Sequence, residues 1–266
     1  MSSVIASDFN LIKIVVLILI LIGFAIVHLI KLMRLYLMVM DQNISFARFV
    51  PAYLRTTLVN LIIPYKLGEI YRIGVFARIT KSFRVGFFCV LADRFFDTLA
   101  LVAILIPCKL LMAGHVTAAE VFLAVFLIVV ILAYVLLPSS YKYLNRYIIT
   151  RKTSRRSLRA LKGLEAVHEW YLYVQELISG RYGLLMVSSL GAWIAEIAVL
   201  FGVAFLLDMH FDALGFANYI SSILSGSTDR LNVIYTIWGA AIIAAATLVF
   251  TAIYLLGRDR GRTGGK

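Results

Sequence analysis

Two clusters of alternating charge interrupt a chain that is otherwise strongly apolar. Glu69 and Arg72 are three residues apart, so they share one face of a helix. Asp93 and Asp97 are four apart and also share a face, on which Arg94 can reach Asp97. A charged side chain at the centre of a bilayer costs at least about 2.5 kcal/mol, so it normally faces a partner, a cavity or a polar substrate. The clusters therefore either brace neighbouring helices as ion pairs or line a polar cavity.

The composition around these clusters is that of a membrane protein. Of the 266 residues, 62% are apolar and 15% are charged, against about 25% charged in a soluble domain. The mean hydropathy is +0.94. The net charge of +12 comes from basic residues that cluster beside apolar runs, where anionic lipid headgroups are a nearer partner than nucleic acid. We therefore expect a polytopic membrane protein that does not bind nucleic acid.

Five apolar runs are long enough to cross a hydrocarbon core of about 30 Å. Their approximate bounds are residues 11–30, 85–107, 117–137, 184–207 and 231–256. The first run follows no basic region and precedes no small-residue cleavage site, so we interpret it as an anchor and not as a removable leader. The predicted fold class is all-α: one transmembrane domain over residues 1–266, built as a polytopic membrane helix bundle.

Basic loops predict the orientation of these spans. Between Lys142 and Lys162 there are eight Lys and Arg residues and no acid, and the C-terminal tail is also basic. Positively charged loops favour the cytoplasmic side of a membrane. We therefore expect this loop, the C-terminus and the segment from Lys31 to Arg48 on the cytoplasmic side, and the N-terminus outside.

This orientation predicts an unusual structure for residues of about 49–80. Both flanks of the segment are expected to be cytoplasmic, yet its apolar arm from Phe49 to Pro64 has only 16 residues. Pro64 removes a backbone donor and Gly68 permits a tight turn. We therefore predict a re-entrant helical hairpin. Its broken backbone at membrane depth implies a cavity, because such backbone must be buried in protein or reached by water.

Two further segments carry weaker signals. The stretch from Phe211 to Leu224 is moderately apolar, and it is either a second re-entrant helix or part of an outside loop over residues 208–230. Residues of about 155–179 have apolar positions at three- and four-residue spacing after a basic start. This period predicts an amphipathic helix on the cytoplasmic face, with an ordinary solvated helix as the alternative.

Motifs of enzymes and metal sites are missing from the sequence. Cys89 and Cys108 have no CxxC or histidine companion, the four histidines are dispersed, and neither HExxH, GxSxG nor a phosphate-binding glycine loop occurs. The pair of Asp93 and Asp97 resembles half of a magnesium-diphosphate site, but there is no second Asp-rich motif. We expect no enzymatic activity, no catalytic residues, no metal and no cofactor.

The order of motifs over residues 28–105 resembles the lysylphosphatidylglycerol synthase transmembrane family, which includes the flippase domain of bacterial aminoacyl-phospholipid synthases. Members commonly show an asparagine, then Pro-Gly-Arg-x-Gly-Glu, then an arginine, and later Glu-Arg-x-x-Asp. The matching positions are Asn60, Pro64 to Glu69, Arg72 and Asp93 to Asp97. Tyr65, Lys66 and Asp93 replace the usual glycine, arginine and glutamate, and a C-terminal Pro-Gly-Gly-x-Gly-x-x-Glu motif is absent.

This resemblance implies a flippase-like lipid translocase in the bacterial inner membrane. It would move a phosphate-bearing headgroup, of a phospholipid or a polyprenyl-phosphate-linked lipid, across the bilayer. Arginine and lysine would contact the phosphate, and the acids would balance them or meet an amine or hydroxyl of the headgroup. Glu196, in the fourth span, either lines the same cavity or pairs with an arginine. The implied substrate-binding residues are Arg55, Asn60, Lys66, Glu69, Arg72, Asp93, Arg94, Asp97 and Glu196.

Two other functions remain open at this point. The chain could be a scaffold that recruits a glycosyltransferase through its basic loop, or a transferase that acts on a polyprenyl phosphate. The expected partners are membrane lipids, either anionic phospholipid or polyprenyl phosphate, together with a glycosyltransferase or a second copy of the chain.

Overall fold

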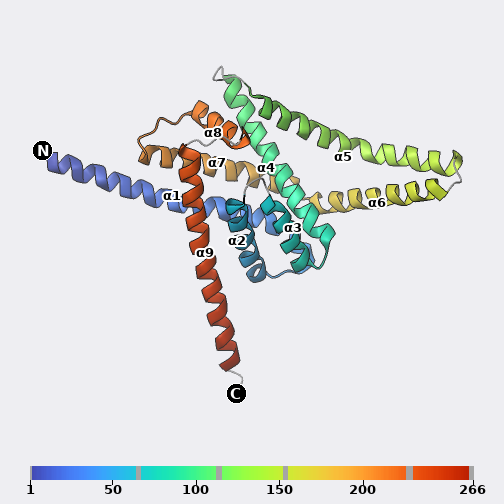
Figure 1. Ribbon diagram of the computed structural model, residues 1–266, viewed down its shortest axis with the longest axis horizontal. Helices are drawn as coiled ribbons and strands as arrows, with labels where there is room; N and C mark the ends of the chain where they lie inside the picture. Colours follow the sequence, from blue (N-terminus) through green and yellow to red (C-terminus); the bar gives the residue numbers. More distant parts are fainter. Residues whose placement is uncertain (1, 64–66, 112–115, 152–154, 226–229, 264–266) are drawn as a thin grey trace.

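The computed structural model describes residues 2–63, 67–111, 116–151, 155–225 and 230–263, and none of these residues lies in a strand. This confirms the all-α prediction. Figure 1 shows the helices as an open bundle from which one pair extends as an arm. The helices are α1 (Ser2–Val39), the 3-10 helix η1 (Met40–Gln42), α2 (Phe46–Ile62), α3 (Leu67–Thr80), α4 (Phe83–Leu111), α5 (Ala118–Arg151), α6 (Arg155–Ile178), α7 (Tyr182–Leu206), α8 (Ala213–Ser225) and α9 (Arg230–Thr263).

Within the described residues, four helical segments are long and apolar enough to cross a membrane. They are Leu11–Gln42, Glu120–Thr150, Tyr182–Leu206 and Arg230–Ile253. Helix α4 covers the remaining predicted span but is not among them, and it carries Asp93, Arg94 and Asp97 near its middle. A helix with this much internal charge depends on its neighbours to neutralise it.

Two helices extend well beyond the predicted spans. Helix α1 continues from Ile30 to Val39, and α5 continues through Pro138 to Arg151. An apolar run predicts the part of a helix that can lie in hydrocarbon, whereas the backbone hydrogen bonds of the helix continue past the end of that run. As a result, Lys31 and Arg34 belong to a packed helix and not to a loop.

The predicted break between two short helices is present. Helix α2 ends at Ile62 and α3 begins at Leu67, and the two helices pack against each other. The turn residues 64–66 lie outside the described residues, and the re-entrant depth of the pair stays a prediction. Gly68 lies inside α3 and not at a turn. A Cβ atom there would lie 2.5 Å from Asn60 Cα, so the glycine permits close contact between the two helices.

Helices α1 and α7 lie side by side and form the spine of the bundle (Figure 1). Small residues permit their approach: a Cβ on Gly23 would lie 2.5 Å from Val199, and one on Gly202 would lie 2.9 Å from Ile20. The buried apolar core falls into two clusters, one where α1 meets α2, α3 and α4, and one where α1 and α7 meet α8 and α9.

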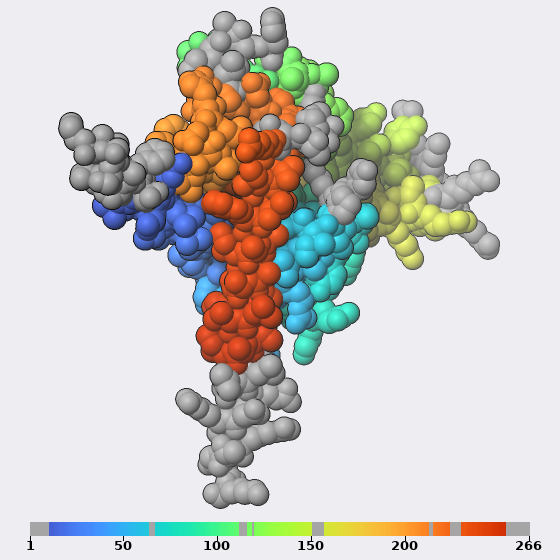
Figure 2. Space-filling view, turned by 60° about the vertical axis from the view of Figure 1, so that its left-hand side comes forward, coloured from blue at the N-terminus to red at the C-terminus, as the bar shows by residue number. Residues whose placement is uncertain are grey.

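The remaining helices cover the edges of this core. Figure 2 shows α9 running down one face of the molecule, and it packs against α2. Helix α8 buries Phe216, Ala217 and Ile220 against the bundle, so the stretch from Phe211 to Leu224 contains a packed helix. Helix α6 occupies the segment predicted to be an amphipathic helix, and it packs on α5 to form the arm in Figure 1.

Candidate functional site

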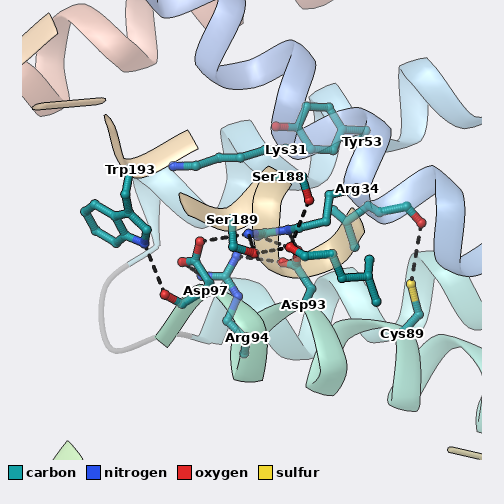
Figure 3. A network of polar contacts seen from close by, with 12 residues as sticks. Lys31, Arg34, Tyr53, Cys89, Asp93, Arg94, Asp97, Ser188, Ser189 and Trp193 are labelled. Atoms are coloured by element: carbon teal, nitrogen blue, oxygen red, sulfur yellow. Dashed lines mark hydrogen bonds and ion pairs between the residues drawn. The ribbon is translucent and has the colours of Figure 1, made fainter. Parts of the chain in front are cut away.

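Arg34 of α1 is the centre of a buried ionic network (Figure 3). Its side chain is 1% exposed, as is that of Asp93. Its Nε donates to Asp93 Oδ1 at 2.8 Å, and its Nη2 lies 2.6 Å from the same oxygen. Its Nη1 donates to Asp97 Oδ1 at 3.1 Å and to Ser189 Oγ at 2.7 Å. All three nitrogens of Arg34 are therefore engaged, and they join α1, α4 and α7.

Arg72 of α3 is buried but only weakly paired. Its side chain is 4% exposed, and its Nη1 lies 3.4 Å from Glu69 Oε2 and 3.7 Å from Asp93 Oδ2. Its Nε is buried without a hydrogen-bond partner among the described residues. A buried unsatisfied donor costs about 1–3 kcal/mol. The fold therefore holds a cation in the network with donor capacity to spare.

Arg94 of α4 lies at the rim of the network. Its side chain is 41% exposed, the largest exposed fraction among the cations of the network. Its Nη2 donates to Asp93 Oδ2 at 3.0 Å, and its Nε lies 3.4 Å from Glu69 Oε1. Its Nη1 is 3.8 Å from Asp97 Oδ2. Asn60 Nδ2 donates to Glu69 Oε1 at 2.9 Å and so orients that carboxylate.

A neighbouring pair extends the network along α1 and α7. Lys31 Nζ donates to Glu196 Oε2 at 2.6 Å and lies 5.8 Å from the centre of the Trp193 ring. Trp193 Nε1 in turn donates to the backbone oxygen of Asp97 at 3.1 Å, which connects this pair to α4 (Figure 3). The site thus contains an ammonium held between a carboxylate and an aromatic ring, next to the arginine cluster.

The network is balanced in charge. Each carboxylate lies within 4 Å of at least one cation, as partial burial of so many charges requires. An anion that enters the site must therefore compete with a resident carboxylate for each cation. The members are four cations, Lys31, Arg34, Arg72 and Arg94, and four carboxylates, Glu69, Asp93, Asp97 and Glu196.

The structure brings most of the predicted site residues together. Glu196 joins the others through Lys31 and Trp193. Arg55 is exposed on α2 and is not part of the described network. Lys66 lies outside the described residues. Those that meet in the network are Asn60, Glu69, Arg72, Asp93, Arg94, Asp97 and Glu196.

Sequence reasoning missed Lys31 and Arg34 as site residues. Both were assigned to a cytoplasmic flank, from Lys31 to Arg48, because basic segments beside an apolar run favour that side of the membrane. A signal was present: Leu32, Leu35 and Met38 continue the helical period of that run, and all three are buried. Basic residues inside a continued amphipathic pattern lie on a packed helix, where charge faces a partner.

A second buried ion pair lies apart from this network. Lys109 Nζ of α4 lies 2.7 Å from Glu120 Oε1 of α5, and both side chains are at most 3% exposed. Ser221 of α8 donates to Glu120 Oε1 at 2.8 Å, and the backbone N–H of Thr117 donates to Oε2 at 2.8 Å. Each charge is satisfied, so we interpret this pair as a brace between α4, α5 and α8.

Metal-binding geometry is not found in the described part of the chain. No group of three or more His, Cys, Asp or Glu side chains there converges as a metal site requires. The carboxylates of the network point at guanidinium and ammonium groups instead. The arrangement is suited to hydrogen bonding with a charged ligand.

Comparison with known families extends the similarity seen at the motifs. The model of the lysylphosphatidylglycerol synthase TM region matches residues 3–227, which include every member of the network. No curated protein and no solved structure matches the chain significantly. The matched range covers most of the chain, from α1 through α8. The chain therefore belongs to the family of lysylphosphatidylglycerol synthase transmembrane regions.

Proposed function

We propose that the protein is a lipid translocase whose ionic network takes a phosphate-bearing headgroup, of a phospholipid or a polyprenyl-phosphate-linked lipid, across the bacterial inner membrane. The observation that carries the proposal is the unequal pairing of the arginines. Arg72 and Arg94 each keep a buried Nε without a hydrogen-bond partner among the described residues, whereas every nitrogen of Arg34 is engaged. Guanidinium forks match phosphate oxygens, so arginines that keep an N–H without a hydrogen bond suit this ligand.

An internal brace would account for Arg34 but not for the other two arginines. A buried ion pair stabilises the contact between helices most when every donor of the cation has a close acceptor. Arg34 meets this condition, with contacts of 2.6–3.1 Å. Arg72 instead makes contacts of 3.4 and 3.7 Å, and Arg94 is 41% exposed. These geometries leave both cations able to change partners.

Exchange of partners gives a route for the headgroup. A phosphate that reaches the exposed Arg94 would replace its long contacts, at 3.4 Å to Glu69 and 3.8 Å to Asp97. Asp97 keeps Arg34 as its partner, and Glu69 keeps Arg72 and the amide of Asn60. Each carboxylate that contacts Arg94 therefore keeps at least one other arginine within 4 Å during the exchange, which avoids the cost of a bare charge in a low-dielectric interior. The released carboxylate oxygens can accept hydrogen bonds from a hydroxyl or amine of the headgroup.

A scaffold function is the second candidate, and the arm of α5 and α6 favours it. The arm projects away from the bundle (Figure 1) and carries exposed apolar residues of α6, Leu158 and Trp170 among them. A glycosyltransferase or a second copy of the chain could dock there. On this reading, changes in the arm would abolish function, and neutralising the network would not.

The test is headgroup exchange by the purified protein in vesicles. Arg72→Gln and Arg94→Gln should each reduce the exchange of labelled phosphatidylglycerol by about tenfold or more, because a charge-assisted hydrogen bond contributes about 1.5–3 kcal/mol. Arg78→Gln is the matched control, since Arg78 is an exposed arginine on the same helix as Arg72. If both network variants insert and transport normally, the network is a brace and the translocase proposal is wrong.

A further inference from the structure

An apolar groove runs along α4 on the side that faces α5 and α6. It has a volume of about 340 Å³, and its wall includes Leu91, Ala92 and Phe95 of α4, Ile131 of α5 and Val174 of α6. The hydroxyls of its two tyrosines, on α5 and α7, lie 3.3 Å apart and hydrogen-bond to each other. The wall therefore offers little to a polar ligand and suits an apolar one.

The apolar wall of the groove favours a hydrocarbon chain as its occupant. A chain of methylene groups has no polar atom that such a wall would leave without a hydrogen-bond partner. It is also flexible, so it can follow the course of the groove along α4.

The groove meets the ionic network at one edge of α4. Leu91 is three residues before Arg94, and positions three apart on a helix are neighbours. Both side chains are open at this edge, Arg94 at 41% and Leu91 at 49% exposed. A phosphate on Arg94 would thus place the first carbons of its lipid beside Leu91, at the mouth of the groove.

We propose that this groove seats one hydrocarbon tail of the lipid whose phosphate contacts Arg94, an inference that rests on the proposed function. A tail that leaves bulk lipid for the groove moves between two apolar surroundings and gains little hydrophobic free energy. Occupancy therefore depends on the phosphate contact, which distinguishes this tail from ordinary lipid around the protein. The groove then holds the tail on one side of α4 while the headgroup enters the network on the other.

Photolabelling tests this directly. The full chain is reconstituted in vesicles of digalactosyl diacylglycerol, a bilayer lipid without phosphate, that contain a trace of phosphatidylglycerol with a diazirine in one tail. A second preparation contains diacylglycerol with the same tails. Phosphatidylglycerol should label Leu91, Phe95 and Ile131 about tenfold more than diacylglycerol does. Phe122 and Val125, exposed on α5, are the reference surface and should be labelled equally by both probes.

Three variants sharpen the result. Arg94→Gln should lower the labelling of the groove by phosphatidylglycerol to the diacylglycerol level. Ala92→Phe should fill the groove and abolish labelling of Ile131, whereas Ala103→Phe, at an exposed alanine of the same helix, should not. If Ala92→Phe fails to fold, the labelling of Arg94→Gln still shows whether occupancy of the groove depends on the phosphate contact.

Equal labelling by the two probes, or labelling that survives Arg94→Gln, would overturn the inference. Headgroup exchange measured in the same vesicles tests the translocase proposal separately. Phosphate-dependent labelling without exchange would refute translocation and support the groove as a lipid-binding site. Exchange without phosphate-dependent labelling would support translocation and refute the groove.

Discussion

Three arginines of the network have the same chemistry but different surroundings. Arg34 is enclosed and its nitrogens meet acceptors on α4 and α7, while Arg72 is enclosed without close acceptors. Arg94 is partly exposed. All three arginines carry the same charge. What differs is how many guanidinium nitrogens have a close acceptor, and this number indicates whether the arginine stabilises the bundle or is available to a ligand.

Replacing Arg34 by methionine should destabilise the protein by about 3–5 kcal/mol, because Asp93 would lose its closest cation inside the bundle. Thermal unfolding in detergent measures this loss. Arg94→Gln is the comparison, since Asp93 keeps Arg34 and the loss should be clearly smaller. Equal destabilisation by the two substitutions would contradict the separate roles assigned to them.

At the scale of elements, α4 separates two environments. One face carries the charges that meet α1 and α3, and the other faces the apolar groove beside α5 and α6. Its charged face is neutralised by side chains from other helices, which is why a helix with three central charges can pack inside an apolar bundle. The short helices α2 and α3 bring Glu69 and Arg72 to that face, and their separation depends on Gly68.

Gly68→Ala should destabilise the protein by about 1–3 kcal/mol and weaken headgroup exchange, because the new Cβ would lie 2.5 Å from Asn60 Cα and force α3 away. Unfolding and exchange assays together check both effects. Gly74→Ala on the same helix meets nothing within 4 Å and should be neutral or stabilise by up to about 1 kcal/mol. Equal effects of the two substitutions would show that the close contact between α2 and α3 at Gly68 determines neither stability nor headgroup exchange.

At the scale of the whole molecule, charge is arranged in two ways. Inside the bundle the ionic network sums to zero, while the chain as a whole has a net charge of +12. The excess positive charge therefore lies outside the network, where it can meet anionic headgroups at the membrane surface. The brace between Lys109 and Glu120 holds α4, α5 and α8 together at a distance from this site.

The predicted orientation places α6 in the cytoplasm and the segment after α7 outside. A cysteine at Arg159, exposed on α6, should resist a membrane-impermeant thiol reagent added to intact cells. A cysteine at Asp212, exposed before α8, should react with it. Cys89 and Cys108 are replaced by alanine first. The reverse labelling pattern would invert the orientation and place the C-terminus outside.

The sequence by itself determined the all-α fold and its apolar helices, because helix length and period depend on neighbouring residues along the chain. The order of its motifs also resembled that of the family, and this resemblance implied that Glu69, Arg72 and the charges of α4 belong to one site. The tertiary structure alone decided that Arg34 completes the network, that Arg55 is left exposed, and that Gly68 serves helix contact. These facts depend on which helices meet in space. The packing of α1 and α7 against α4 joins residues that are more than 50 positions apart in the sequence.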